Sequence, residues 1–174
     1  MEPDESMKSW YMLTLVGEDR SGIVARVSDA LFLGGWTLGE ASMIRLGGNF
    51  TIMMMVSGSG DIDSILAPVA AELNLHLHVD EISGGLHQHL LPNVQVRVAG
   101  ADRTGIVAQV TGALAKAGFN ILELESDVAG SRDNPVYIMN IQGYADATLE
   151  ALEDAVSGLG DIDVAIAPIE TLIG

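Results

Sequence analysis

The chain contains no cysteine, and this absence excludes several kinds of site. There can be no disulfide framework, no thiol catalyst and no cysteine metal site. The first residues, MEPDES, are acidic and polar, unlike the positively charged start of a secretory signal. The apolar runs stay far below the roughly 20 residues that a membrane-spanning helix needs. We therefore expect a cytoplasmic protein that does not enter a membrane.

Basic residues are also scarce. Eight Lys and Arg residues stand against 24 Asp and Glu residues, which gives a formal net charge of −16. Proteins that bind nucleic acid use Lys and Arg to neutralise phosphates. The charge therefore disfavours direct binding of DNA or RNA, and a basic protein partner or simple solubility fits it better.

Catalytic signatures are missing as well. The sequence shows no Ser-His-Asp order, no phosphate-binding loop and no carboxylate pair in a cleft-like context. The composition, 48% hydrophobic and 18% charged, is nevertheless that of a folded protein. We expect a folded protein that is not an enzyme and needs no cofactor.

What the chain does contain is an internal repeat. Residues 17–27, GEDRSGIVARV, recur 83 residues later as residues 100–110, GADRTGIVAQV, with eight of the eleven positions identical. Such a repeat indicates that one supersecondary unit was used twice. We therefore predict two domains, residues 9–82 and 93–172, joined by a linker at residues 83–92.

Each copy of the repeated stretch lies between a β-like run and a helical pattern, which predicts a strand-to-helix turn. Asp19 and Asp102 are interpreted as helix N-caps, because a carboxylate can accept from free N–H groups of the first turn. Gly22 and Gly105 then fall in the first helical turn, where glycine costs about 1 kcal/mol relative to alanine. This cost suggests that a neighbouring strand or a ligand approaches the backbone there.

The periodicity of each half predicts the order β-α-β-β-α-β. Residues 10–16, 36–46, 50–56 and 75–79 are expected as strands of the first unit, and 20–33 and 64–74 as its helices. The second unit is expected to have strands at 94–99, 120–128, 136–141 and 162–169, and helices at 104–117 and 147–159. The predicted fold is α+β: two ferredoxin-like βαββαβ units, each a four-stranded antiparallel sheet with two helices on one face.

Three local predictions accompany this scheme. Residues 129–134 are expected to form a long hairpin loop, and Asp146 to cap the helix that follows it. Pro168 places the last strand at a sheet edge, because proline lacks the N–H that a central strand needs. The segments that begin Gly60-Asp61 and Gly160-Asp161 look alike, but their offset is 100 rather than 83, and we interpret the similarity as a coincidence.

Strand, Gly-x-Asp-Arg-x-Gly-Ile-Val, helix and then Gly-Phe-Asn-Ile, in a ferredoxin-like unit, resembles the ACT domain. Two such units filling residues 9–172 are similar to the glycine cleavage system transcriptional repressor family of tandem ACT proteins. The resemblance implies a small effector, often an amino acid, bound where two ACT domains meet. It also implies a homo-oligomer.

The resemblance places the ligand site at the strand-to-helix turn and at the start of the second strand. It implies ligand contacts from two sets of residues: Gly17, Asp19, Gly22 and Ile23, or Gly100, Asp102, Gly105 and Ile106 together with Asn120. An α-carboxylate suits the free N–H groups of a helix N-terminus, and an ammonium suits a carboxylate. Thr37 stands in the first unit where the second has Asn120, which favours the second unit.

The same residues also have purely structural interpretations. The aspartates and glycines of the turn can serve capping and tight packing alone, and Arg20 and Arg103 fit surface ion pairs better than carboxylate anchors. His76 and His78 share a face of a strand and are expected to be the solvated side of an edge strand rather than a metal site, while His87 and His89 belong to the linker. The run Met53-Met54-Met55, together with Phe50, is expected in the core.

The sequence thus predicts a non-enzymatic amino-acid sensor, with glycine as one candidate effector. Its protein partner would be a transcriptional regulator such as that of the glycine cleavage system. Two alternatives stay open: a detached regulatory subunit that docks on an amino-acid metabolic enzyme, and a purely structural pairing module.

Overall fold

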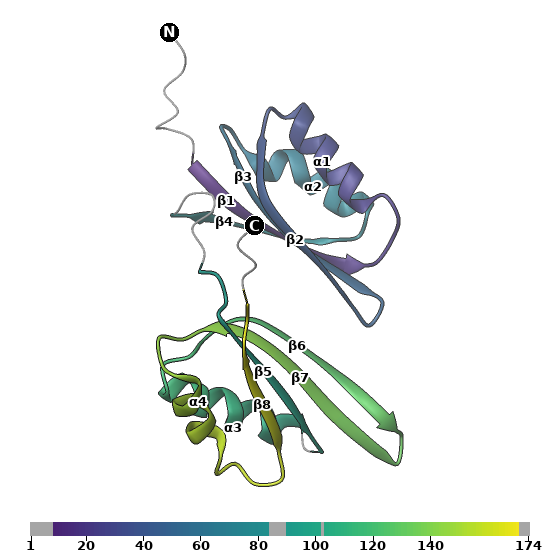
Figure 1. The fold of residues 1–174 in the computed structure, drawn as a ribbon. Coiled ribbons are helices and arrows are strands. Elements are labelled where there is room, and N and C mark those ends of the chain that lie inside the picture. Colours follow the sequence, from purple (N-terminus) through teal and green to yellow (C-terminus); the bar gives the residue numbers. More distant parts are fainter. Residues whose placement is uncertain (1–8, 84–89, 102, 171–174) are drawn as a thin grey trace. The chain divides into compact units, whose positions relative to one another are not determined.

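The structure is a computed structural model that describes residues 9–83, 90–101 and 103–170, without the side chains of residues 103 and 104 (Figure 1). The chain separates into two compact units, residues 1–88 and 89–174. The division falls inside the predicted linker, and the domain bounds 9–82 and 93–172 stay predictions. No helix of the described residues is long and apolar enough to cross a membrane.

The first unit has the predicted order of elements. It consists of β1 (Ser9–Glu18), α1 (Ile23–Leu33), β2 (Thr37–Leu46), β3 (Asn49–Gly58), α2 (Ile62–Glu72) and β4 (His76–Ile82). The strands form one sheet in the order β2-β3-β1-β4, and every pairing is antiparallel.

The second unit repeats this architecture. It consists of β5 (Val94–Gly100), α3 (Arg103–Lys116), β6 (Asn120–Ser131), β7 (Asn134–Tyr144), α4 (Leu149–Val156) and β8 (Asp163–Pro168). Its sheet has the order β6-β7-β5-β8, again antiparallel. The predicted fold class is therefore confirmed. β8 is an edge strand, as Pro168 predicted.

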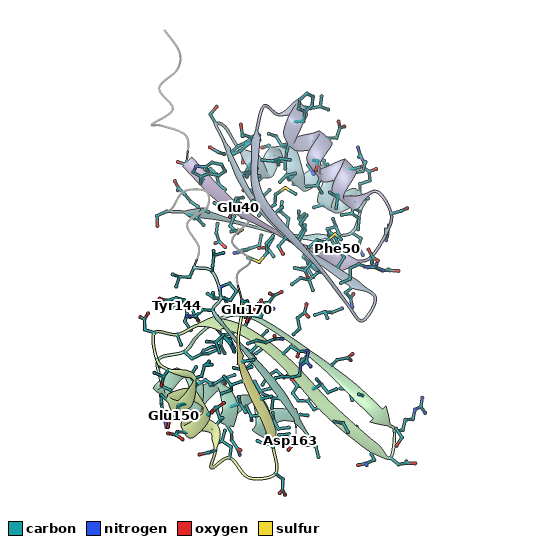
Figure 2. All side chains as sticks on the ribbon, in the orientation of Figure 1. Glu40, Phe50, Tyr144, Glu150, Asp163 and Glu170 are labelled. Atoms are coloured by element: carbon teal, nitrogen blue, oxygen red, sulfur yellow. The ribbon has the colours of Figure 1, made fainter. Side chains whose placement is uncertain are left out.

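The helices of each unit cover one face of its sheet (Figure 1), and side chains fill the space between them (Figure 2). Strand alternation decides which residues lie there: Met54 is 3% exposed, whereas its neighbour Met53 is 47% exposed on the uncovered face. Phe50 and Met54 are core residues as expected, but the prediction was wrong for Met53 and for Met55, which is only partly buried and outside the core cluster. Each unit has a hydrophobic cluster made only of its own residues.

Two predictions about the second unit were wrong. The hairpin between β6 and β7 is not a six-residue loop, because Ser131 pairs with Asn134 and only two residues connect the strands. The cap of α4 is Thr148, whose Oγ1 accepts from the Ala151 N–H at 3.2 Å. Asp146 instead accepts a hydrogen bond from the Tyr144 hydroxyl at 2.6 Å. The helix begins later than the apolar pattern suggested, so the residue immediately before it caps it.

Candidate functional site

The repeated turn does not have the predicted geometry in the first unit. Gly22 is the N-cap of α1 with φ +87°, and no side chain caps the helix. A Cβ on Gly22 would meet nothing within 4 Å, so no strand approaches it. Glycine is required by the left-handed conformation rather than by a close neighbour. The interpretation of Asp19 as N-cap was therefore wrong.

Asp19 instead fastens the turn to the hairpin between β2 and β3. Its N–H donates to the carbonyl oxygen of Gly48 at 3.1 Å, and its carboxylate lies 2.7 Å from Nε of Arg45. The side chain of Ile23 is only 2% exposed and belongs to the core. In the first unit the described contacts of Asp19 and Ile23 are structural, although they differ from the predicted capping.

In the second unit, Gly105 lies inside the first turn of α3, as predicted. A pocket of about 310 Å³ opens beside it, lined by Ala101, Gly105, Ile106, Gln109, Leu159, Asp161 and Ile162. The pocket combines the N-terminal end of a helix, whose dipole favours anions, with an acidic residue, Asp161, in its lining. A small zwitterion carries both complementary charges. Asp102, the predicted cap and ligand contact, lies outside the described residues.

Gly17 and Gly100, the predicted site glycines at the strand ends, are packing residues. A Cβ on Gly17 would lie 2.6 Å from Cδ2 of Leu75, and one on Gly100 would lie 2.5 Å from Cδ1 of Ile106. Ile106 is itself 2% exposed, so it contributes to the pocket as a wall beside the core. Gly100 lets that isoleucine lie against the end of β5.

Asn120 does not join Gly105 within one unit. It pairs with Tyr144, next to the pairing of Gly143 with Val94, at the start of β5. Gly105 follows the other end of that strand, beyond Gly100, about 20 Å away at ~3.4 Å per residue. The structure therefore brings Gly105 and Ile106 together with Asp161 and leaves Asn120 at the opposite end of the sheet.

Sequence reasoning missed both polar side chains of the pocket lining, Gln109 and Asp161, and its apolar residues Ala101, Leu159 and Ile162. Gln109 lies one helical turn after Gly105 and Ile106, so helical spacing could have revealed it. Asp161 follows α4, a placement that only the fold discloses. Asp61, its apparent sequence counterpart, is the N-cap of α2, with its carboxylate accepting from the Asp63 N–H at 3.1 Å. The two aspartates thus occupy different places, as the offset of their segments indicated.

The histidines of β4 are placed as expected. His76 and His78 are exposed on the edge strand of the first sheet, and Nε2 of His78 lies 3.1 Å from the Asp80 carboxylate. Over the residues that the structure describes, no group of three potential metal ligands occurs. His87 and His89 lie outside the described residues.

Comparison with known proteins decides the family. Residues 11–82 match the ACT domain, and residues 94–155 match it a second time. The chain belongs to the ACT-domain family. It is 26% identical over 141 residues to the glycine cleavage system transcriptional repressor of Escherichia coli (strain K12), covering 79% of this chain and 74% of that protein. The repressor of Shigella flexneri matches to the same extent.

Solved structures agree on the tandem ACT fold. A protein of unknown function from Galdieria sulphuraria superposes with a TM-score of 0.73 at 24% identity, covering 94% of this chain and 99% of that one. A protein assigned as a glycine cleavage system transcriptional repressor superposes with a TM-score of 0.71 at 20% identity, covering 95% and 99%. At these identities the likeness shows the fold alone.

Proposed function

We propose that this tandem ACT protein senses a small amino acid, without enzymatic activity, and regulates a protein partner. The observation that supports the proposal is the pocket at the start of α3, whose lining includes Gly105 in the first helical turn and the acidic residue Asp161. The similarity to the glycine cleavage repressors suggests a transcriptional regulator as partner and glycine as one candidate effector. A location in the cytoplasm follows from that role.

In this proposal the effector's carboxylate meets the N–H groups of the first turn of α3, and its ammonium meets Asp161. Leu159 and Ile162 line the same pocket and offer an apolar wall to the effector's side chain. Asn120 can take part only from a second chain, as in the expected homo-oligomer. The effector shifts the protein between two states only by its differential affinity for them.

A thermal-shift screen of the amino acids tests the proposal. An amino acid at about 100 times its dissociation constant should stabilise the protein by roughly 2.7 kcal/mol. Gly105→Val should abolish the shift, because its side chain would stand where the ligand must meet the helix. Asp161→Asn should weaken the shift, whereas Asp163→Asn, a matched change on β8, should not. A full response in Gly105→Val would place the site elsewhere.

Three further outcomes separate the remaining readings. Asn120→Ala should cost about 0.5–1.5 kcal/mol of binding if the amide makes one neutral hydrogen bond to the effector.

Purified protein alone should give no gel shift with DNA at physiological salt, because its charge is −16. If an amino-acid metabolic enzyme, and no transcriptional regulator, associates with the protein, the detached-subunit alternative replaces the proposed partner.

A further inference from the structure

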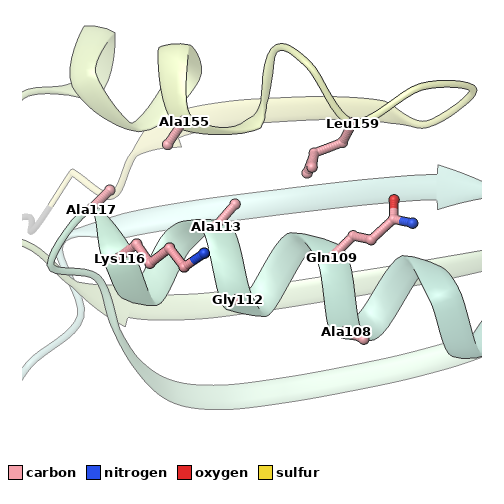
Figure 3. A pocket seen from close by; sticks show the side chains of 8 residues that line it. All are labelled: Ala108, Gln109, Gly112, Ala113, Lys116, Ala117, Ala155 and Leu159. Atoms are coloured by element: carbon pink, nitrogen blue, oxygen red, sulfur yellow. The ribbon is translucent and has the colours of Figure 1, made fainter.

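A second concavity in the second unit lies between its two helices. It has a volume of about 590 Å³, and Ala113, Ala155 and Leu159 point into the space between α3 and α4 (Figure 3). Its lining consists of Ala108, Gln109, Gly112, Ala113, Lys116, Ala117, Ala155 and Leu159. The floor is thus apolar and made mostly of short side chains, so a third helix could approach closely.

Gly112 keeps this groove open without an intramolecular reason. It lies in the interior of α3, where glycine costs about 1 kcal/mol relative to alanine. A Cβ added there would meet nothing within 4 Å, and the residue does not have the positive φ that would call for glycine. Packing and backbone geometry therefore leave this glycine unexplained, and a partner that needs the space would explain it.

The first unit differs at the matching positions. There Arg26 on α1 forms an ion pair with Glu72 on α2, so a charged bridge crosses the two helices. The residue 83 positions after Arg26 is Gln109, and the residue 83 positions after Asp29 is Gly112. The charges of the first unit are thus replaced by a neutral amide and a missing side chain. The ion pair that bridges the two helices of the first unit therefore has no charged counterpart at Gln109 in the second.

Acidic residues on α4 determine the charge of the partner. Glu150, Glu153 and Asp154 are all exposed on this eight-residue helix (Figure 2 labels Glu150). Lys116 is the one cation among the groove residues, at the end of α3. The apolar floor beside an acidic helix, in a protein of charge −16, complements a segment that is apolar on one face and basic on its flank.

We propose that the groove between α3 and α4 docks an amphipathic helix of a protein partner, with a small apolar face and Lys or Arg along one flank. The apolar face packs against Gly112 and Ala155, and the basic flank lies along α4. This deepens the proposed function, because it names the surface through which the sensor reaches its partner.

The test uses the full chain and a fluorescent 18-residue peptide with an alanine and leucine face and lysine flanks. Anisotropy should show binding that Gly112→Leu weakens at least tenfold, because leucine fills the groove. The variant should fold, since leucine is a better helix former than glycine and meets open space. The matched control is Asp29→Leu, the same helix position in the first unit, which should bind like the parent protein.

Charge is tested separately, because an acidic protein attracts any basic peptide. Glu150→Lys together with Asp154→Lys should weaken binding at least tenfold. The control Asp133→Lys changes a charge in the hairpin between β6 and β7 and should have a small effect. A peptide with the same apolar face and glutamate flanks should bind at least tenfold more weakly. Binding to Gly112→Leu as tight as to the parent protein, or an effect of Asp133→Lys as large as that of the double reversal on α4, would overturn the proposal.

Other occupants of the groove would give different results. If Gly112→Leu abolished the amino-acid thermal shift, the groove would be the effector site. If it converted an oligomer to a monomer in sedimentation, the groove would be an interface between copies. Both results overturn the docking proposal. Peptide binding without a thermal shift by any amino acid would support the docking surface and contradict the sensor function. The failure of one proposal is therefore distinguishable from the failure of the other.

Discussion

The ring of Trp36 lies directly over Gly58: a Cβ on this glycine would be 2.6 Å from Cδ2 and Cε3 of the indole. The second unit has the same relationship between Phe119 and Gly143, where the Cβ would be 2.4 Å from Cζ of the ring. Each aromatic residue lies immediately before the second strand of its unit, and its ring covers the strand that precedes the second helix. The two copies therefore share an aromatic–glycine contact as well as the strand-to-helix turn.

This contact predicts that Gly58→Ala destabilises the first unit by about 1–3 kcal/mol, the usual cost of overpacking. The indole lies against Gly58, and the ring of Tyr11 meets it edge-on with the two ring centroids 5.7 Å apart. These neighbours restrict the movement of the indole. Chemical denaturation measures the effect. Gly158→Ala is the control, since its Cβ would meet nothing within 4 Å. Equal stability of the two variants would show that the indole of Trp36 moves aside without cost, which contradicts the prediction.

The left-handed cap of α1 predicts a graded effect at Gly22. Gly22→Ala should cost roughly 1–2 kcal/mol, because an L-residue at φ +87° is strained. Gly22→Asn should cost less, since asparagine tolerates this region better. Urea melts of both variants compare the two costs. If alanine were tolerated as well as asparagine, the helix would have shifted its start.

The cap of α4 predicts that Thr148→Ala lowers stability by about 1 kcal/mol, because the Ala151 N–H loses its side-chain acceptor. Thr148→Ser keeps the hydroxyl and should restore most of the loss. Asp146→Ala is the informative contrast for the corrected assignment: it should leave the helicity of α4 unchanged. A loss of helicity in Asp146→Ala, measured by circular dichroism, would return the capping role to Asp146.

Tyr144 should titrate at an unusually high pH. Its hydrogen bond to Asp146, followed by the repulsion between the carboxylate and a phenolate, raises the pKa of the hydroxyl above 10.0. A raised folded-state pKa means that this contribution to stability is present below the unfolded pKa and is lost as pH rises through the folded pKa. In Asp146→Asn, NMR of the Tyr144 ring carbon should show ionisation at lower pH. An unchanged titration contradicts the assignment.

Much of the fold was predictable because burial follows local periods. In β3, Ile52, Met54 and Val56 alternate with less buried residues, and the same strand alternation gave the predicted order of elements. The errors in this stretch, Met53 and Met55, came from treating three consecutive methionines alike. Alternation assigns the middle one to the sheet face under the helices and exposes the first.

The site was less predictable, because identical residues of the two repeats have different backbone conformations. Gly22 and Gly105 occupy the same position in the repeat, yet one precedes its helix and the other lies within it. Where a helix begins depends on backbone hydrogen bonds that the motif does not encode. The resemblance to the ACT domain predicted Asn120 beside Gly105, but strand register separates the two residues within the unit. Asp161 enters the pocket only through the three-dimensional path of the loop after α4.

The separate hydrophobic clusters of the two units have a consequence for synthesis. β1 lies between β3 and β4, so the first sheet cannot close until the last strand of its unit, ending at Ile82, has left the ribosome. From that moment its core cluster is complete, since every member of the cluster among the described residues belongs to the unit. The first unit can fold while the second is still being translated. The nascent chain therefore exposes one unfinished sheet at a time, which limits mispairing between two copies of similar sequence.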